Sequence, residues 1–124
     1  MSVSIIKNTD TSIKFKIYDD YILKNPIDLS SYIDLIFAIT EDGRLIIEKK
    51  YSENGINIST DLSSGIQYIA TVSINKKDTE FVAINPSKEE RIRTLELFGI
   101  DNTRKVVRFL ITEFYLEGSG YYVK

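Results

Sequence analysis

Apolar and polar residues alternate along much of the chain, a spacing that predicts β-strands rather than helices. The alternation is regular from Thr11 to Asp19 and from Gly65 to Ile74, and it continues on both sides of Glu41-Asp42-Gly43. Successive side chains of a strand point to opposite faces of a sheet, so each segment has one apolar face. The pattern therefore predicts antiparallel strands with one buried face and one face in water.

The segment from Ile33 to Tyr51 predicts a β-hairpin whose register depends on the length of its loop. A two-residue loop, Asp42-Gly43, would place Phe37 opposite Glu48, an apolar residue against a charge. A three-residue loop, with its glycine in the left-handed conformation, instead pairs Phe37 with Ile47 and keeps one face continuously apolar. We therefore expect the three-residue loop.

A second long hairpin is predicted near the C-terminal end, where Arg91–Ile100 pairs with Arg104–Leu116. Its second arm is apolar on both faces, which indicates a central strand in a covered sheet or a strand covered by another subunit. Between the hairpins, Thr79–Ile84 fits a strand or one loose helical turn. We favour the strand, because Phe81 and Val82 are poor helix formers.

Eight or nine short strands and no strong amphipathic helix predict an all-β fold, an antiparallel β-sandwich of immunoglobulin-like architecture. We expect residues 1–117 to form this single domain and residues 118–124, which begin Gly118-Ser119-Gly120, to form a flexible tail. The expected core consists of Phe15, Ile17, Leu35, Phe37, Ile47, Val72, Leu97, Phe109 and Ile111.

The amino-acid composition excludes several classes of function. The 124 residues suit one domain, and a net charge of −2 with interspersed signs gives no basic patch for nucleic acid. Cysteine is absent, which excludes disulfides, thiolate chemistry and cysteine-based zinc sites. Histidine is absent too, which removes the commonest general base and excludes a Ser-His-Asp triad. No apolar run reaches the length of a membrane span and no signal peptide is evident, so we expect a soluble chain with no membrane partner.

The remaining candidate sites have simpler interpretations. Asp19-Asp20 and Asp42-Gly43 lack the alternating acidic loop of a calcium site, and turn formation explains them better. Eight tyrosines and six phenylalanines could form a platform for sugar rings, although aromatic residues at strand spacing more often belong to a core or an interface. A carbohydrate-binding or adhesin module is therefore the alternative function. We expect no catalytic residue, no metal ligand and no cofactor; an enzyme is the second alternative, which the missing histidine and cysteine disfavour.

One order of short motifs resembles a known family. The motifs are Asp10-Thr11 at the start of a strand, Pro26-Ile27-Asp28-Leu29, the turn glycine Gly43, the strand-leading Gly65, and Asp78-Thr79. Over roughly residues 9 to 79 this order resembles the N-terminal domain of phage baseplate upper proteins and related immunoglobulin-like tail or head-decorating modules. The pattern departs after Thr79, where the family usually has a Pro-Gly turn leading into a tyrosine.

The resemblance implies a non-enzymatic structural component of a tailed-phage or prophage virion, assembled in the cytoplasm of the bacterial host. Its expected partners are other virion proteins and further copies of itself, with no nucleic acid.

Two segments are candidates for binding these partners. In the expected hairpin, Ile36, Ala38 and Ile46 point away from the core and form an apolar patch with a charged rim, the layout of a modest interface. Another part of the same chain could equally cover that patch. At the C-terminus, Tyr121-Tyr122-Val123 could add a strand to the sheet edge of a neighbour, or fold back on its own domain.

Overall fold

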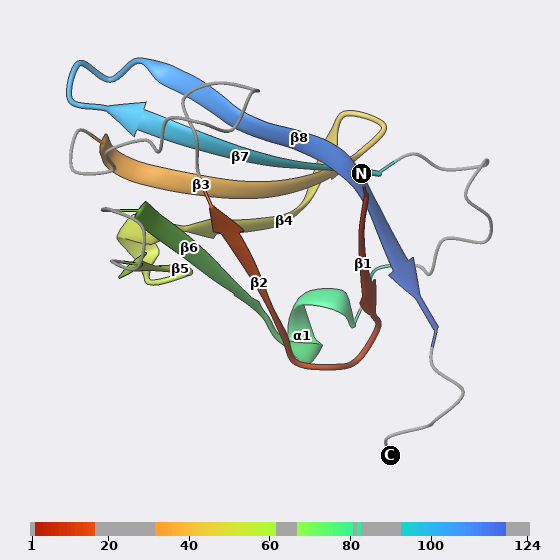
Figure 1. Cartoon of the computed structure of the whole chain (residues 1–124). Coiled ribbons are helices and arrows are strands. Elements are labelled where there is room, and N and C mark those ends of the chain that lie inside the picture. The colour runs from red at the N-terminus through yellow and green to blue at the C-terminus, as the bar shows by residue number, and fades with distance from the viewer. Residues whose placement is uncertain (1, 17–31, 62–66, 81, 83–92, 119–124) are drawn as a thin grey trace.

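The computed structural model describes residues 2–16, 32–61, 67–80, 82 and 93–118, which form two packed β-sheets (Figure 1). In chain order the elements are β1 (Ser2–Ile6), β2 (Thr11–Lys16), β3 (Tyr32–Glu41), β4 (Arg44–Lys50), the 3-10 turn η2 (Tyr51–Glu53), β5 (Ile56–Asp61), β6 (Gln67–Ile74), α1 (Lys76–Thr79), β7 (Arg93–Asp101) and β8 (Val106–Glu117). The larger sheet has the order β1-β8-β7-β3-β4 and the smaller sheet the order β2-β6-β5. The predicted all-β sandwich is confirmed, with eight strands in the described residues.

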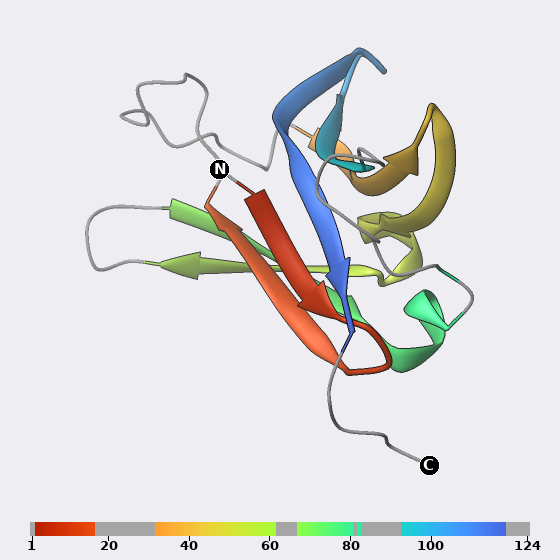
Figure 2. The ribbon, with the colours of Figure 1, turned by 90° about the vertical axis from the view of Figure 1, so that its right-hand side faces the viewer.

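The two sheets lie face to face, and the chain changes sheet between β1 and β2 (Figure 2). β1 pairs with β8 in parallel, whereas every other described strand pair is antiparallel. The backbone N–H of Lys7 continues this pairing by donating to the carbonyl of Glu117 at 2.8 Å. Asn8 then turns the chain with a positive φ of 63°. The first strand therefore closes one edge of the larger sheet and the second strand closes an edge of the smaller one.

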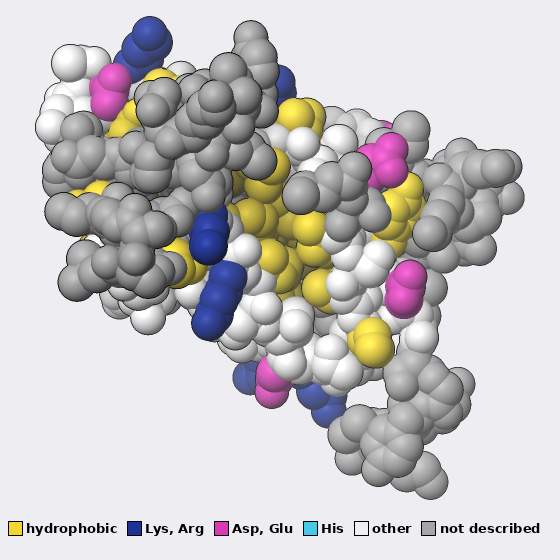
Figure 3. Space-filling view, viewed as in Figure 1, with side chains coloured by type: hydrophobic (Ala, Val, Ile, Leu, Met, Phe, Trp, Pro, Cys, Tyr) yellow, Lys and Arg dark blue, Asp and Glu magenta, His cyan; other side chains and the backbone are white. Residues whose placement is uncertain are grey.

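A single apolar core fills the space between the sheets, and Figure 3 shows hydrophobic side chains between them on the side of β1 and β2. Six of the predicted core residues are buried: Phe15, Leu35, Phe37, Ile47, Val72 and Leu97. Phe109 is half-buried and packs against this cluster. Ile111 was predicted in the core and this prediction is wrong, because its side chain is 49% exposed. Ile17 lies outside the described residues.

The β3–β4 hairpin corrects the expected register. Its turn is the two-residue loop Asp42-Gly43, with φ values of 50° and 77°. The pairing then shifts by one residue at Ile46, which forms a β-bulge, and beyond it Phe37 lies opposite Lys49. The expected three-residue loop and the pair of Phe37 with Ile47 are therefore wrong.

The bulge explains how the tight turn and the apolar face coexist. One extra residue in a strand changes which residues face the core from that point on. Without it, the two-residue loop would direct Glu48 inward; with it, Ile47 faces inward and Glu48 outward. The expected inward position of Ile47 is therefore correct, whereas Leu45, expected on the same face, is 50% exposed, and Ile46, expected on the outer face, packs against the core.

A second bulge, in β8, explains why that strand is apolar on both faces. The pairing of β7 with β8 shifts so that Phe109 is the extra residue. Phe109 and its neighbour Leu110 both pack against the core, and the inward positions after the bulge include Phe114 and Leu116. Ile111 consequently points outward, which is the physical reason for its exposure.

The polar segment after β6 forms the one-turn helix α1, where the sequence favoured a strand beginning at Thr79. The backbone N–H of Asn75 donates to the carboxylate of Asp78 at 2.6 Å, completing a capping box that starts the turn. Lys49 of β4 also reaches Asp78, with 2.8 Å between Nζ and Oδ2. No described residue of the expected strand pairs in a sheet, so that prediction is wrong for the described part.

Candidate interaction surface

The face of the larger sheet that points away from the smaller sheet carries two neighbouring rows of side chains. Each row crosses β8, β7, β3 and β4 in that order. The first row is Ile111, Glu96, Ala38 and Glu48, and the second row is Arg108, Phe98, Ile36 and Lys50. We call these eight side chains the outer-face patch.

Alternation along the strands places the patch on this face. On β3, Leu35, Phe37 and Ile39 are buried in the core cluster, so Ile36 and Ala38 between them must point to the other side. The same alternation applies to β7, and the two bulges bring the outward residues of β4 and β8 into line with them.

Three of the four middle positions of the patch are apolar, namely Ile36, Ala38 and Phe98, and Ile111 adds an apolar side chain at the β8 end. Ile111 is 49% exposed, and Ile36 and Phe98 are half-buried. Ala38 is only 8% exposed although it does not belong to the core cluster. Its methyl group is shorter than the side chains beside it on the sheet, Ile36, Glu48 and Glu96.

Charged side chains lie next to these apolar residues and form two ion pairs. Arg108 lies 3.4 Å from Glu96, measured from Nη1 to Oε2, and Lys50 lies 3.6 Å from Glu48, measured from Nζ to Oε1. Both pairs are partly exposed, and such pairs add little to stability. Their arrangement determines which charges a partner must present to this face. Both acids lie in the first row and both bases lie in the second.

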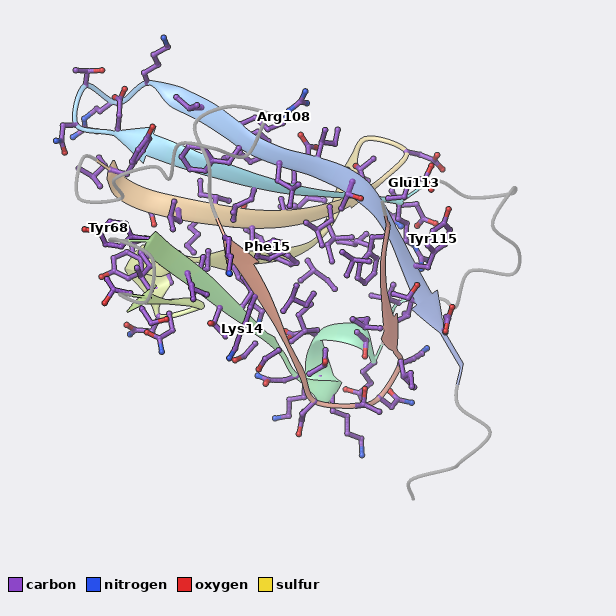
Figure 4. The ribbon with its side chains drawn as sticks, in the orientation of Figure 1. Lys14, Phe15, Tyr68, Arg108, Glu113 and Tyr115 are labelled. Carbon is purple, nitrogen blue, oxygen red and sulfur yellow. The ribbon has the colours of Figure 1, made fainter. Side chains whose placement is uncertain are left out.

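β8 carries a further polar pair beyond the first row. The hydroxyl of Tyr115 donates to Oε2 of Glu113 at 2.6 Å, and this hydrogen bond raises the pKa of the tyrosine above its ordinary value. Figure 4 shows Arg108, Glu113 and Tyr115 along this strand. The charged rim therefore continues along β8 toward its end.

The structure brings together two of the residues predicted to bind partners and separates a third. Ile36 and Ala38 lie side by side on the outer face, as expected. Ile46 does not join them, because it is the bulge residue of β4 and packs against the core cluster. Tyr121, Tyr122 and Val123 lie outside the described residues.

The sequence analysis missed the part of the patch contributed by β7 and β8. The alternation of Leu95, Glu96, Leu97 and Phe98 was a usable signal, because it directs Glu96 and Phe98 to the face opposite the two leucines. Ile111 could not be assigned from alternation alone, because the bulge precedes it.

A pocket of about 400 Å³ lies where the start of β3, the η2 turn and the smaller sheet meet. It is lined by Tyr32, Asp34, Leu35, Tyr51, Ile58, Ser59, Thr60 and Tyr68. Figure 4 shows Tyr68 on β6 at this end of the molecule. Three tyrosines give the pocket aromatic surface with hydroxyl groups.

Among the described residues that line the pocket, the carboxylate of Asp34 has a structural role. Asp34 accepts hydrogen bonds from the backbone N–H and the hydroxyl of Ser52, at 3.0 and 2.8 Å, and from the N–H of Leu35 at 2.9 Å. These bonds fix η2 against β3. A hydrolytic site built on two carboxylates would need a second acid, and the described residues that line the pocket include none.

Within the described part of the chain, no three Asp, Glu, His or Cys side chains cluster in a way that could hold a metal ion. The described helices include none that is long and apolar enough to cross a membrane.

Fold and surface together define a small β-sandwich with a partly apolar, charge-flanked sheet face. No protein-family model matches the chain, and no curated protein matches it either.

Proposed function

We propose that this chain is a non-enzymatic structural component of a tailed-phage or prophage virion and acts through protein–protein contacts. The observation that carries the proposal is the outer-face patch. It combines one exposed and two half-buried apolar side chains, Ile111, Ile36 and Phe98, with neighbouring charges on a sheet face on which no described helix or strand packs. Exposed apolar surface of this kind marks interaction sites.

The residue content supports a non-enzymatic role. Without histidine or cysteine, general base and nucleophilic chemistry would depend on carboxylates, lysines or hydroxyls. The carboxylate of Asp34 in the pocket is already engaged in holding η2.

Three of the five motifs that resemble the phage module lie in the described residues and occupy structural positions there, which supports the virion assignment; Pro26-Ile27-Asp28-Leu29 and Gly65 lie outside the described residues. Asp10 precedes β2 and accepts a hydrogen bond from the N–H of Lys76 at 2.8 Å. Gly43 makes the β3–β4 turn, and Asp78 and Thr79 end α1 beside the β1–β2 turn. Motifs that build a scaffold fit a module used for assembly.

We also infer an immunoglobulin-like architecture from the strand order. The run β4-β3-β7-β8 corresponds to the C′CFG order of variable-type immunoglobulin sheets, and β5-β6-β2 corresponds to the order DEB of the facing sheet. The parallel pairing of the first strand with the last adds an edge strand to the larger sheet. The shared order supports likeness of architecture only, since fold does not determine function.

Mass spectrometry of purified particles tests the function. Particles released from the host strain should contain the wild-type chain in fixed proportion to the other virion proteins. Ile111→Arg places a charge in the patch at a half-exposed position and should reduce incorporation at least about tenfold while leaving the fold intact. Lys14→Glu, on an exposed position of β2, is the matched control and should incorporate normally. Particles that lack the wild-type chain would refute the proposal.

A carbohydrate-binding module is the second candidate, because the pocket holds three tyrosines. Aromatic faces bind sugar rings by stacking, and the hydroxyls of Ser59 and Thr60 could complete such a site. Calorimetric titration with a panel of bacterial surface oligosaccharides tests this function. Binding that Tyr68→Ala abolishes would favour it, and no heat with any sugar at millimolar concentration would reject it.

A further inference from the structure

We propose that the outer-face patch binds the same patch on a second copy of this chain, across a twofold axis that lies between the two rows and runs perpendicular to the strands. The proposal rests on the proposed role of this face as an interaction surface and identifies the partner. Twofold dimers use one self-complementary surface on both subunits, so the patch must complement itself.

The direction of the axis determines which side chains meet. Rotation about an axis that crosses the strands reverses the strand direction and keeps the strand order, so β4 faces β4 and β3 faces β3. The first row of each copy then lies over the second row of the other. Face-to-face sheets with nearly aligned strands are a common packing of β-structure.

The charges favour this axis over the alternative. Glu48 and Glu96 lie in the first row, and Lys50 and Arg108 lie in the second. The crossing axis therefore places Glu48 over Lys50 of the second copy at two equivalent contacts, and it places Glu96 over Phe98, one strand away from Arg108 of the second copy. An axis along the strands, midway between β7 and β3, would place Lys50 over Arg108 of the second copy with no acid over either base, which is unfavourable.

The same rotation brings apolar side chains of complementary size into contact. Ala38 in the first row faces Ile36 of the second copy in the second row. Because the side chain of Ala38 is a single methyl group between longer side chains, it leaves room for the larger isoleucine. The contact occurs twice, and Phe98 lies next to it on β7. A small residue facing a large one lets the two surfaces interdigitate.

The size of the patch sets the expected affinity. Eight side chains per copy is well below the roughly 20–30 residues of a standard interface. We therefore expect a reversible dimer with a dissociation constant of about 100 μM, which the crowded surface of a particle would populate.

Charge reversal combined with a charge swap provides the test. Sedimentation equilibrium of the full chain from about 10 μM to 1 mM should show a monomer–dimer equilibrium. Lys50→Glu and Glu48→Lys should each raise the dissociation constant about tenfold or more, because each brings like charges together at two places. The double variant Glu48→Lys/Lys50→Glu restores opposite charges and should return to within about threefold of wild type. Lys14→Glu on β2 should change nothing.

Three results would overturn the proposal: a chain that remains monomeric at about 1 mM, single reversals without effect, or a swap that fails to restore dimerisation. Circular dichroism shows whether each variant is folded. If a charge-reversal variant fails to fold, Ile111→Arg is tested in its place. This substitution puts an arginine over Arg108 of the second copy and should weaken the dimer to a similar extent. A dimer that Ile111→Arg leaves unchanged would also overturn the proposal.

The outcomes also separate this inference from the proposed function. A monomeric chain whose incorporation into particles still depends on Ile111 would remove the dimer and leave the virion role standing. A chain that dimerises as described but is absent from particles would refute the virion role and leave the dimer standing.

Discussion

Gly99 on β7 lies at a position that two aromatic rings have already filled. A Cβ atom added there would lie 2.6 Å from two ring carbons of Phe109 and 2.8 Å from Cδ1 of Tyr32. The two rings pack edge to face, with centroids 5.1 Å apart and an interplanar angle of 79°. Gly99→Ala therefore cannot be accommodated unless at least one ring moves.

The expected loss follows from three contributions. Forcing an extra carbon into a packed site costs about 1–3 kcal/mol. Disturbing an edge-to-face pair costs a further 0.5–1.5 kcal/mol or so. Against these, alanine in a strand is favoured over glycine by roughly 0.5–1 kcal/mol. We therefore expect Gly99→Ala to lower the free energy of unfolding by about 1–3 kcal/mol.

A double-mutant cycle with Phe109→Ala isolates the contact. Phe109→Ala should cost less than the roughly 3–5 kcal/mol of a fully buried ring, because Phe109 is half-buried. In that background the Tyr32 ring, 2.8 Å from the added Cβ, can move into the space that Phe109 leaves, so Gly99→Ala should be close to neutral, which gives a coupling energy of about 1–3 kcal/mol. Urea denaturation followed by circular dichroism measures all four proteins.

Val106→Ala provides the matched control background, because Val106 is 60% exposed. There, Gly99→Ala should cost as much as in the wild type. The reasoning is refuted if Gly99→Ala costs under about 0.5 kcal/mol, or if Phe109→Ala does not relieve its cost.

Three further predictions concern the core, a buried ion pair and a turn. Phe37→Ala should lower the free energy of unfolding by about 3–5 kcal/mol in urea denaturation, because Phe37 is fully buried; a loss under about 1 kcal/mol would contradict its place in the core. Glu41→Ala should cost about 3 kcal/mol in the same assay, because it removes the carboxylate 3.5 Å from the buried guanidinium of Arg93; a cost near zero would show that the pair is dispensable. In the β7–β8 turn, the Thr103 hydroxyl donates to Asp101 and lowers the pKa of that carboxyl below its ordinary value of 3.8. The stability from this contact is therefore present above the ordinary value and is lost as pH falls through the lowered native pKa; Thr103→Ala should move that pKa upward in a carboxyl NMR titration, and an unchanged value would contradict the assignment.

The inner faces of the strands could be predicted from the sequence because alternation is a local property. Phe15 on β2, Leu35 and Phe37 on β3, and Val72 on β6 all lie in regular alternating segments, and all are buried. Each of these assignments required only the alternation of apolar and polar residues within that one strand.

The two bulges could not be predicted, because a bulge depends on what the partner strand requires. The extra residues Ile46 and Phe109 are apolar residues within apolar stretches, so nothing in the local sequence separates them from their neighbours. The parallel pairing of β1 with β8 is equally non-local, since it joins the two ends of the chain. The start of α1 was different, because its capping box, Asn75 with Asp78, was visible in the sequence.

The bulge in β8 also changes which kind of partner the larger sheet can accept. The sequence predicts that β8 is central in a covered sheet or is covered by another subunit, because both of its faces are apolar. The bulge turns Phe109 and Leu110 onto the core and leaves Ile111 as the exposed isoleucine of that strand. Ile36 and Phe98, on the middle strands β3 and β7, are half-buried and add apolar surface to the same outer face. A partner that only added a strand to a free edge would leave this surface in water, so the geometry favours one that packs face to face on the sheet.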